Sequence, residues 1–369
     1  MDKNLAIIGA SYLQLPLILK AKEMGYITHV FAWAANDVGE KEADFFYPIS
    51  IVEKDTILEK CREIGICGIC SIASDLAVIT VNYVANAMGL PGNTEESTRK
   101  STNKHLMRRA FEKNGDPSPK SILVDSSSDL SDIDIPYPAI VKPTDRSGSR
   151  GIYKIYSPSE LPDAVERAIR QSMEHRALIE EFAEGREYSV EYISYRKKHT
   201  FLAVTQKYTT GAPHFVETGH LEPAPVTREE KEKIQKVVEH ALDTLEVQNG
   251  ASHSEIKIDN DGNIKIIEIG ARMGGDCIGS HLVFYSTGYD FVKMVIQVAC
   301  GDAPDFTKAC DPISVESRFI ISQEDLDAFN RLLAEEPEKV LEVVDMHPEK
   351  IGQMTDSSNR AGCYIRRAE

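Results

Sequence analysis

The stretch that decides the fold is Ser254-Glu255-Ile256-Lys257-Ile258-Asp259-Asn260-Asp261-Gly262-Asn263-Ile264-Lys265-Ile266-Ile267-Glu268-Ile269-Gly270-Ala271-Arg272. Two isoleucine-rich runs flank a central Asp-Asn-Asp-Gly, which is typical of a hairpin turn. The pattern therefore predicts two strands, over 252–258 and 263–269. Folding this hairpin brings Glu255 and Glu268 to a similar height, on one face of the sheet.

This pair of glutamates is a candidate metal site. Each carboxylate lies among isoleucines, where its burial is costly unless a cation or a hydrogen-bond donor compensates it. Mg²⁺ (or Mn²⁺) suits such oxygen ligands and takes one or two carboxylates together with substrate phosphates. The planar fork of Arg272 suits a phosphate or a carboxylate. The alternative is a pair of solvent-exposed edge-strand glutamates with Lys257 and Lys265 as partners, and the hairpin alone leaves both interpretations open.

A candidate anion-binding element lies upstream, where a predicted strand over 138–142 delivers Lys142 to a loop rich in Ser and Gly. Small residues let backbone N–H groups surround phosphate oxygens, and a lysine adds a point charge. The loop residues singled out are Ser147, Gly148, Ser149 and Gly151. Their order is not that of a Walker A loop, and a flexible surface loop is the alternative.

A third element is the segment 178–187, which reads as a strand followed by a turn. Its carboxylates could hold ribose hydroxyls while the backbone at Glu181 and Phe182 contacts an adenine edge. Taken alone, the segment could be any strand followed by a turn.

The first hundred residues alternate strand and helix signals. Apolar runs at 5–8, 28–33 and 67–72 are each followed by a helical segment, so the pattern predicts βαβ units and a parallel, doubly wound sheet. Gly9-Ala10-Ser11 lies where a dinucleotide phosphate loop would lie, but it lacks the G-x-G-x-x-G spacing. A polar stretch over 93–103 then leads into a predicted helix that begins at Lys104.

The composition narrows the class of protein. The chain has 369 residues, with 42 Lys and Arg against 58 Asp and Glu, for a formal net charge of −16. Such an acidic surface repels phosphate backbones and argues against nucleic-acid binding. No apolar run reaches the ~18 residues of a membrane span. Cys67-Gly-Ile-Cys70 could be a redox pair or half a zinc site, but a buried strand explains it better. These features predict a cytoplasmic, multidomain enzyme.

Taken in order, four elements resemble the ATP-grasp superfamily: Lys104, Lys142 with its Ser-Gly loop, the 180–187 segment, and the hairpin with Arg272. The motifs at 216–220 and 253–257 look most like those of L-amino acid ligases that make dipeptides. The resemblance implies an α/β and α+β fold, in which a pre-ATP-grasp domain precedes two α+β subdomains that clamp ATP. The implied domains span 1–98, 99–183 and 184–369.

The resemblance also implies roles for single residues. Those that would hold ATP are Lys104, Lys142, Ser147, Gly148, Ser149, Gly151, Glu180, Glu181, Phe182 and Glu187, with the loop closing over the β- and γ-phosphates. Those that would coordinate Mg²⁺ are Glu255 and Glu268. Those that would meet the substrate are Glu217, His220, Arg272, Gly274 and Gly275. Arg272 would stabilise the transferred phosphoryl group, and His220 is a candidate base. Many members carry Asn two residues after the second metal glutamate, where this chain has Gly270.

The function that the resemblance implies is an ATP-dependent carboxylate–amine ligase that works through an acyl phosphate. Its partners would be a small-molecule carboxylate and an amine, without nucleic acid or membrane, and a homodimer is compatible with it. Two alternatives are a purine-biosynthesis or carboxylase-type enzyme of the same superfamily and a non-catalytic nucleotide-binding sensor. The intact Glu255, Glu268 and Arg272 speak against the sensor.

Overall fold

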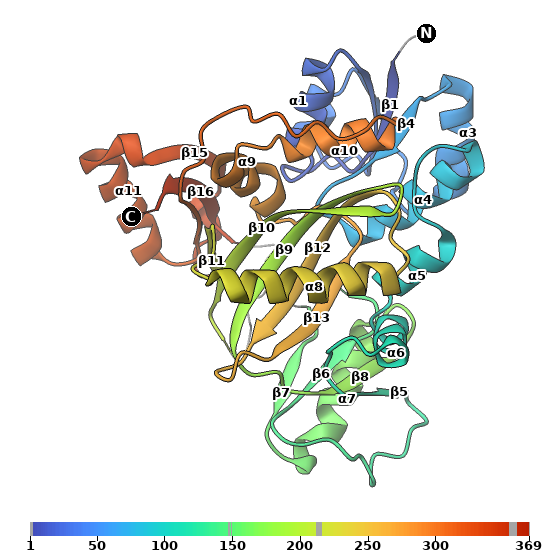
Figure 1. The fold of residues 1–369 in the computed structure, drawn as a ribbon, viewed down its shortest axis with the longest axis vertical. Helices are drawn as coiled ribbons and strands as arrows, with labels where there is room; N and C mark the ends of the chain where they lie inside the picture. Colours follow the sequence, from blue (N-terminus) through green and yellow to red (C-terminus); the bar gives the residue numbers. More distant parts are fainter. Residues whose placement is uncertain (1–2, 147, 149, 212–215, 354–359, 369) are drawn as a thin grey trace.

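The computed structural model describes residues 3–146, 148, 150–211, 216–353 and 360–368. Its strands form three sheets, arranged along the molecule with the large antiparallel sheet between the N-terminal sheet and a small antiparallel sheet (Figure 1). The predicted mixed α/β fold with an N-terminal parallel sheet is confirmed. None of the helices in these ranges is both long and apolar enough to cross a membrane.

The N-terminal unit is a four-stranded parallel sheet in the order β3-β2-β1-β4. Its strands are β1 (Asn4–Ile8), β2 (Ile27–Phe31), β3 (Phe45–Tyr47) and β4 (Gly68–Cys70). The helices between and after them are α1 (Leu15–Glu23), α2 (Val38–Glu42), α3 (Lys54–Ile64) and α4 (Asp75–Met88). Residues 5–8 are fully buried, as the apolar strands of a sheet covered on both faces should be.

Two helices, α5 (Glu95–Thr102) and α6 (Lys104–Asn114), connect this unit to the next sheet. The sequence pattern predicts no helix over the polar stretch 93–103, yet most of this stretch is helical. The hydroxyl of Thr94 caps α5 by accepting from the Ser97 N–H, and Asn103 caps α6 in the same way. Capping therefore outweighs the scarcity of apolar residues here.

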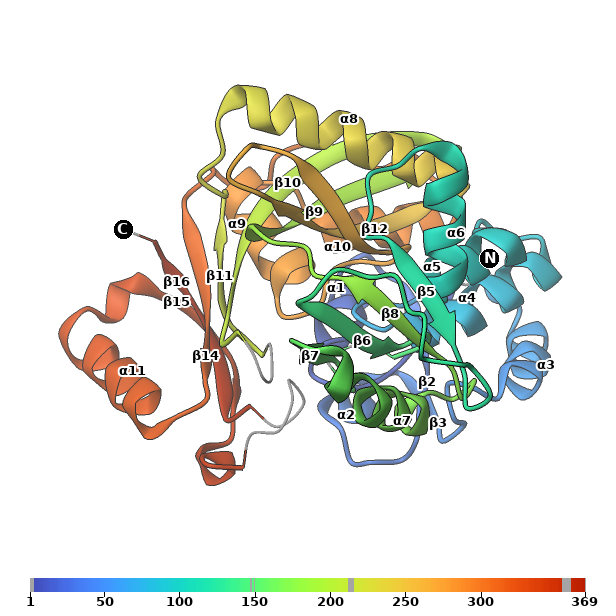
Figure 2. The same ribbon diagram turned by 90° about the horizontal axis from the view of Figure 1, so that it is seen from below.

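The small antiparallel sheet has the order β5-β8-β6-β7. Its strands are β5 (Ser121–Val124), β8 (Ala177–Glu181), β6 (Ala139–Pro143) and β7 (Tyr153–Ile155), with the turn η1 (Pro158–Glu160) and α7 (Leu161–Gln171) packed on them. Figure 2 shows this sheet facing the part of the large sheet that holds β12, with α8 on the other side of the large sheet.

The large sheet has eight strands in the order β13-β12-β9-β10-β11-β14-β16-β15. In that order they are Ile264–Gly270, Gly250–Ile258, Arg186–Tyr195, Lys198–Thr209, Glu217–Glu222, Val315–Ile320, Gly362–Arg367 and Val340–Met346. The remaining elements are α8 (Arg228–Thr244), η2 (Ile278–Leu282), α9 (Val283–Thr287), α10 (Phe291–Ala299), α11 (Gln323–Glu335), η3 (Pro337–Lys339) and η4 (Pro348–Lys350).

Alternation along β9 sends its side chains to two different environments. Tyr188, Val190 and Tyr192 pack against α8, in a core that also holds Ile256 of β12. Ile193 instead joins a core shared with α10 and the N-terminal unit. The polar residues that share the face of Ile193, on β9, β10 and β12, form the wall of the candidate site.

Candidate active site

Glu255 and Glu268 are direct cross-strand partners in the β12–β13 hairpin. Residues opposite each other in an antiparallel pair lie on the same face, so both carboxylates point to one side of the sheet. Each side chain is 26% exposed, which leaves it accessible from the cleft. The prediction that the two acids share a face is confirmed.

The lysine partners of these carboxylates come from outside the hairpin. Lys104 Nζ lies 2.6 Å from Glu268 Oε1, and Lys207 Nζ lies 2.7 Å from Glu255 Oε1. Each acid therefore has a buried lysine as its nearest cation.

The alternative interpretation of the hairpin is wrong in its choice of partners. β13 does lie at the sheet edge, as that interpretation supposed. However, Lys265 pairs with Glu181, and Lys257 lies 3.7 Å from Glu187. Lys257 lies near Phe182, whose ring centroid is 5.0 Å from its Nζ.

Lys207 of β10 is a site residue that sequence analysis missed. Besides Glu255, its Nζ lies 3.3 Å from Glu187 and 3.6 Å from Glu217. Burial lowers the pKa of Lys207, but these three carboxylates outweigh burial and raise it well above its usual value. The same pairing, with help from His253, holds the pKa of Glu255 well below its usual value despite burial. The available signal was strand alternation, which places Lys207 on the polar face of β10.

Lys104 ties the helix α6 to the loop after β6. It is the first residue of α6, and its side chain is 7% exposed. Its Nζ donates to the Arg146 carbonyl at 2.7 Å, and its backbone N–H donates to the Thr144 carbonyl at 2.9 Å. One lysine thus joins the second acid of the hairpin to the loop that follows Lys142.

Glu180 of β8 is fixed inside the protein by two cations. Arg108 Nε lies 2.9 Å from its Oε1, and Lys142 Nζ lies 2.7 Å from its Oε2. Burial raises the pKa of Glu180, but Arg108 and Lys142 hold it below its usual value. Burial lowers the pKa of Lys142. Sequence analysis missed Arg108, although its i,i+4 spacing from Lys104 places both side chains on one face of α6.

A cleft of about 160 Å³ brings most of the predicted residues together. Those that line it are Lys104, Lys142, Gly148, Glu180, Glu181, Phe182, Glu187, Glu217, Glu255, Glu268 and Arg272. Four other predicted residues do not line it: Gly151, His220, Gly274 and Gly275. Ser147 and Ser149 lie outside the described residues. The predictions from separate motifs thus converge on one cleft.

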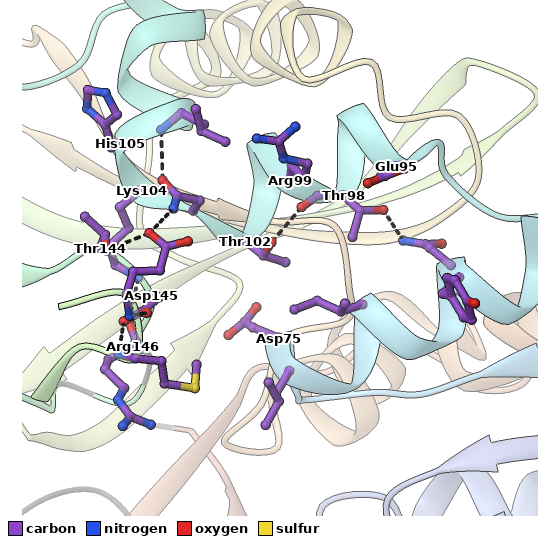
Figure 3. A pocket seen from close by; sticks show the side chains of 18 of the residues that line it. Asp75, Glu95, Thr98, Arg99, Thr102, Lys104, His105, Thr144, Asp145 and Arg146 are labelled. Carbon is purple, nitrogen blue, oxygen red and sulfur yellow. Dashed lines mark hydrogen bonds between the residues drawn. The ribbon is translucent and has the colours of Figure 1, made fainter. Parts of the chain in front are cut away.

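A larger cavity, of about 1180 Å³, adjoins this cleft and shares Lys104, Arg146 and Glu268 with it. Figure 3 shows Asp75 extending into it from the first turn of α4, with Lys104 and Arg146 on the facing wall. The space beside Glu268 therefore opens toward the N-terminal unit.

His253 of β12 is a second residue that sequence analysis did not select. Its Nδ1 lies 2.5 Å from Glu191, and its Nε2 lies 3.5 Å from Glu255. Burial lowers the pKa of His253, but Glu191 and Glu255 raise it to about 9. The imidazole is therefore protonated at neutral pH. Glu191 also accepts from the Gly274 N–H at 3.2 Å, so it joins the strand to the turn after Arg272.

His220 lies apart from the cleft. Its side chain has no exposed surface, and its ring packs edge-on against Phe319. The nearest acid is Asp276, 3.9 Å from Nε2. Burial lowers the pKa of His220 although Asp276 opposes this, so the ring is neutral at pH 7. Its role as a base stays a prediction, and it requires a substrate to reach a side chain that this structure buries.

Arg272 is held by the N-terminal unit. Its Nε and Nη2 donate to the two carboxylate oxygens of Asp75, at 2.7 and 2.9 Å. Burial raises the pKa of Asp75, but the guanidinium outweighs it and the pKa is lowered. Four residues further on, Asp276 accepts two hydrogen bonds from Arg360. The glycine-containing turn between Arg272 and Asp276 is thus held at one end by Asp75 of the N-terminal unit and at the other end by Arg360, near the C-terminus.

The two glutamates fit a magnesium ion that takes its other ligands from phosphates and water. Across the described ranges, no group of three or more His, Cys, Asp and Glu could hold a metal. The donor set is therefore that of a phosphate-bound Mg²⁺ rather than of a closed protein site.

Residues 135–280 match the ATP-grasp domain family. The chain is 27% identical over 263 residues to alanine–anticapsin ligase of Bacillus subtilis, covering 63% of this chain and 54% of that protein. The L-amino acid ligase of Bacillus licheniformis has the same fold, with a TM-score of 0.82, 22% identity, and coverage of 99% of this chain and 93% of the other. Phosphoribosylglycinamide synthetase from Anaerococcus prevotii also has this fold, with a TM-score of 0.79 and 22% identity. The match covers 100% of this chain and 95% of the other.

The chain spans about half the length of the first curated relatives that it matches. At 22% identity the two solved structures show the fold alone, and they act on different substrates by their names.

Proposed function

We propose that this chain, which carries an ATP-grasp domain over residues 135–280, is an ATP-dependent ligase that joins a carboxylate to an amine. The observation that carries the proposal is the shared face of Glu255 and Glu268, with Arg272, Lys142 and the 180–182 backbone in the same cleft. This arrangement suits a nucleotide whose base lies near β8 and whose phosphates reach the hairpin.

The chemistry follows from the need to activate a carboxylate. An oxygen of the substrate carboxylate attacks the γ-phosphorus of ATP, the bond to the bridging oxygen breaks, and ADP leaves. The amine then attacks the acyl carbon of the acyl phosphate, phosphate leaves, and the amine gives up a proton. Positioning and charge neutralisation dominate such a transfer, so little covalent participation by the protein is required.

The residues of the cleft divide these tasks. Lys104 and Lys142 bind phosphate oxygens, and Arg272 stabilises the charge on the transferred phosphoryl group. Glu255 and Glu268 would hold Mg²⁺, which would supply further charge neutralisation on the phosphates. The side chains of Lys104, Lys142 and Arg272 are each paired with a carboxylate, which reduces the reorganisation needed during the reaction.

Within this class we favour an amino acid as the carboxylate substrate. The supporting observation is Glu217, which lies in the cleft 3.6 Å from Lys207 and belongs to the motif that resembles L-amino acid ligases. A carboxylate at this place can bind the ammonium group of an amino acid.

The test is ADP release from ATP and Mg²⁺ across a panel of amino acids, dipeptides, bicarbonate and phosphorylated amines. Release that requires one amino acid and one amine supports the proposal, whereas release with bicarbonate or a phosphorylated amine favours the purine or carboxylase alternative. Nucleotide binding without any release favours a sensor.

Glu268→Gln is the matched variant for this assay. It should lower turnover at least ~100-fold, because metal binding and transition-state stabilisation are both lost, while the melting temperature stays close to that of the parent. Glu229→Gln, on the exposed first turn of α8, is the control and should retain full activity. Near-parental turnover of Glu268→Gln would refute the role of the hairpin.

A further inference from the structure

Gly270 occupies the position where many ATP-grasp proteins carry Asn, and the structure shows that a side chain there would displace the side chains of Asp75 and Arg272. A Cβ on residue 270 would lie 2.9 Å from Asp75 Oδ1 and 3.2 Å from Arg272 Nε. Cβ atoms essentially never approach another atom within 3.0 Å. The space is filled by the ion pair between Asp75 and Arg272.

This ion pair fixes the direction of the guanidinium. An arginine has five N–H donors, of which Nε and one N–H of Nη2 bind Asp75. One N–H of Nη1 donates to the Met273 carbonyl at 3.3 Å. Within the described ranges two N–H donors of Arg272 remain for a ligand. Because a bidentate pair holds the plane of the fork, their direction into the cleft is set by Asp75.

The N-terminal unit is shaped to present Asp75. Ala73, two residues earlier, has a left-handed backbone with φ of +58°, which is unusual for a non-glycine residue. Its N–H donates to the Met273 carbonyl at 3.2 Å, so the strained residue is bonded to the same turn as Arg272. Ser74 then caps α4, and Asp75 is the first residue of that helix. The left-handed backbone at Ala73 thus helps to direct the chain so that the Asp75 carboxylate reaches Arg272.

We propose that Asp75 is a positioning residue for Arg272, and that Gly270 is required because a side chain there would displace Asp75. The N-terminal unit thereby supplies part of the phosphoryl-transfer site without touching the nucleotide. The inference rests on the proposed function of Arg272. In this inference, the glycine at position 270 leaves room for the ion pair that orients the Arg272 guanidinium. The replacement of Asn by Gly therefore does more than remove a possible metal ligand.

The test compares Asp75→Asn, Gly270→Ala and the double variant. Each single change should lower kcat by about 10- to 100-fold, because a catalytic group is misplaced. The KM for ATP and the Kd for Mg·ADP should stay within about twofold, because Glu255, Glu268 and both lysines are untouched. The kcat of the double variant should be no lower than that of the less active single variant, because both changes act through the same guanidinium.

A second readout does not depend on turnover. In ¹⁵N spectra the Arg272 Nε–H signal, assigned through Arg272→Lys, should be protected from solvent exchange in the parent and exposed in Asp75→Asn and in Gly270→Ala. Asp44→Asn is the control, because Asp44 binds Thr28 within the N-terminal unit and can change stability without touching Arg272.

Additive losses in the double variant, parental kcat in Asp75→Asn, or an unchanged Arg272 signal would each overturn the inference. If no substrate pair releases ADP, the proposed function fails, yet the exchange measurement still decides whether Asp75 and Gly270 control Arg272. If Asp75→Asn does not fold, Gly270→Ala carries the same test with the carboxylate retained.

Discussion

Lys207 and Glu222 are both buried on the same face of the large sheet, but only Lys207 is charged at pH 7. Lys207 has three carboxylates within 3.6 Å and remains charged. Glu222 accepts hydrogen bonds from the hydroxyls of Thr205 and Ser286, and it pairs with no cation among the residues that the structure describes. Burial therefore raises the pKa of Glu222 to about 8, so its carboxyl is neutral at pH 7. A buried charge survives here only where an opposite charge meets it.

Glu222 makes the stability of the protein depend on pH. In the unfolded chain it loses its proton near pH 4.5, but in the folded protein it keeps it to about pH 8. The free energy of unfolding should therefore fall between these values, by about 1.4 kcal/mol per pH unit from this group. Glu222→Gln removes the dependence, so urea unfolding should show a stabilisation that grows from pH 5 to pH 8. The exposed Glu229→Gln should show no such trend, and a pH-independent difference for Glu222→Gln would contradict the prediction.

At the scale of the element, the junction between β8 and β9 depends on a close backbone approach. Gly185 has φ of +113°, and a Cβ there would lie 2.2 Å from the Ile258 carbonyl oxygen at the end of β12. This approach sets the entry of β9, which carries Glu187 and Glu191 toward the cleft. The loop between β8 and β9 can therefore approach the end of β12 this closely only at a residue without a side chain.

Gly185→Ala should lower the free energy of unfolding by about 2 kcal/mol or more, since it combines a backbone clash with an unfavourable φ. Gly250→Ala is the matched control: its φ is +93°, but open space surrounds its Cβ position. Urea titrations of both variants separate the clash from the backbone strain. Equal losses in the two variants would show that the approach to Ile258 costs little.

At the scale of the whole molecule, the N-terminal unit shares one core with α10 and the large sheet. Leu5, Ile7 and Leu17 of the N-terminal unit pack in the same cluster as Met294 of α10 and Ala251 of β12. In Figure 1, α10 lies between the N-terminal sheet and the large sheet. Because separating the N-terminal unit from the large sheet would expose these apolar side chains to water, the shared core holds the two parts together.

Met294→Ala should therefore weaken both parts, by about 2–5 kcal/mol in the free energy of unfolding. Hydrogen exchange should show faster exchange of β1 and β4 amides, although these strands are far from Met294 in the chain. Val343→Ala, at an exposed site on β15, should leave these amides protected. Unchanged exchange in β1 and β4 would mean that the N-terminal unit is stable by itself.

The sequence by itself determined the hairpin and what it places on one face. Glu255 and Glu268 share a face because a short turn and strand alternation are local properties, and Lys104 begins its helix because Asn103 caps it. The parallel N-terminal sheet follows in the same way from apolar runs that alternate with helical segments. The hairpin and the helix cap depend on contacts within a few residues or across a single turn. The parallel sheet pairs strands that are distant in the chain, such as Leu5 with Gly68, but its repeating strand–helix pattern is visible in the sequence.

Only the tertiary structure decided which partners the charged residues meet. Lys207 rather than Lys257 pairs with Glu255, Arg108 and Lys142 hold Glu180, and Asp75 reaches Arg272 across nearly 200 residues of chain. The same holds for the burial of His220, which its motif did not predict. Partner choice depends on which strands and helices pack together, and that outcome is set by the whole core and not by local spacing.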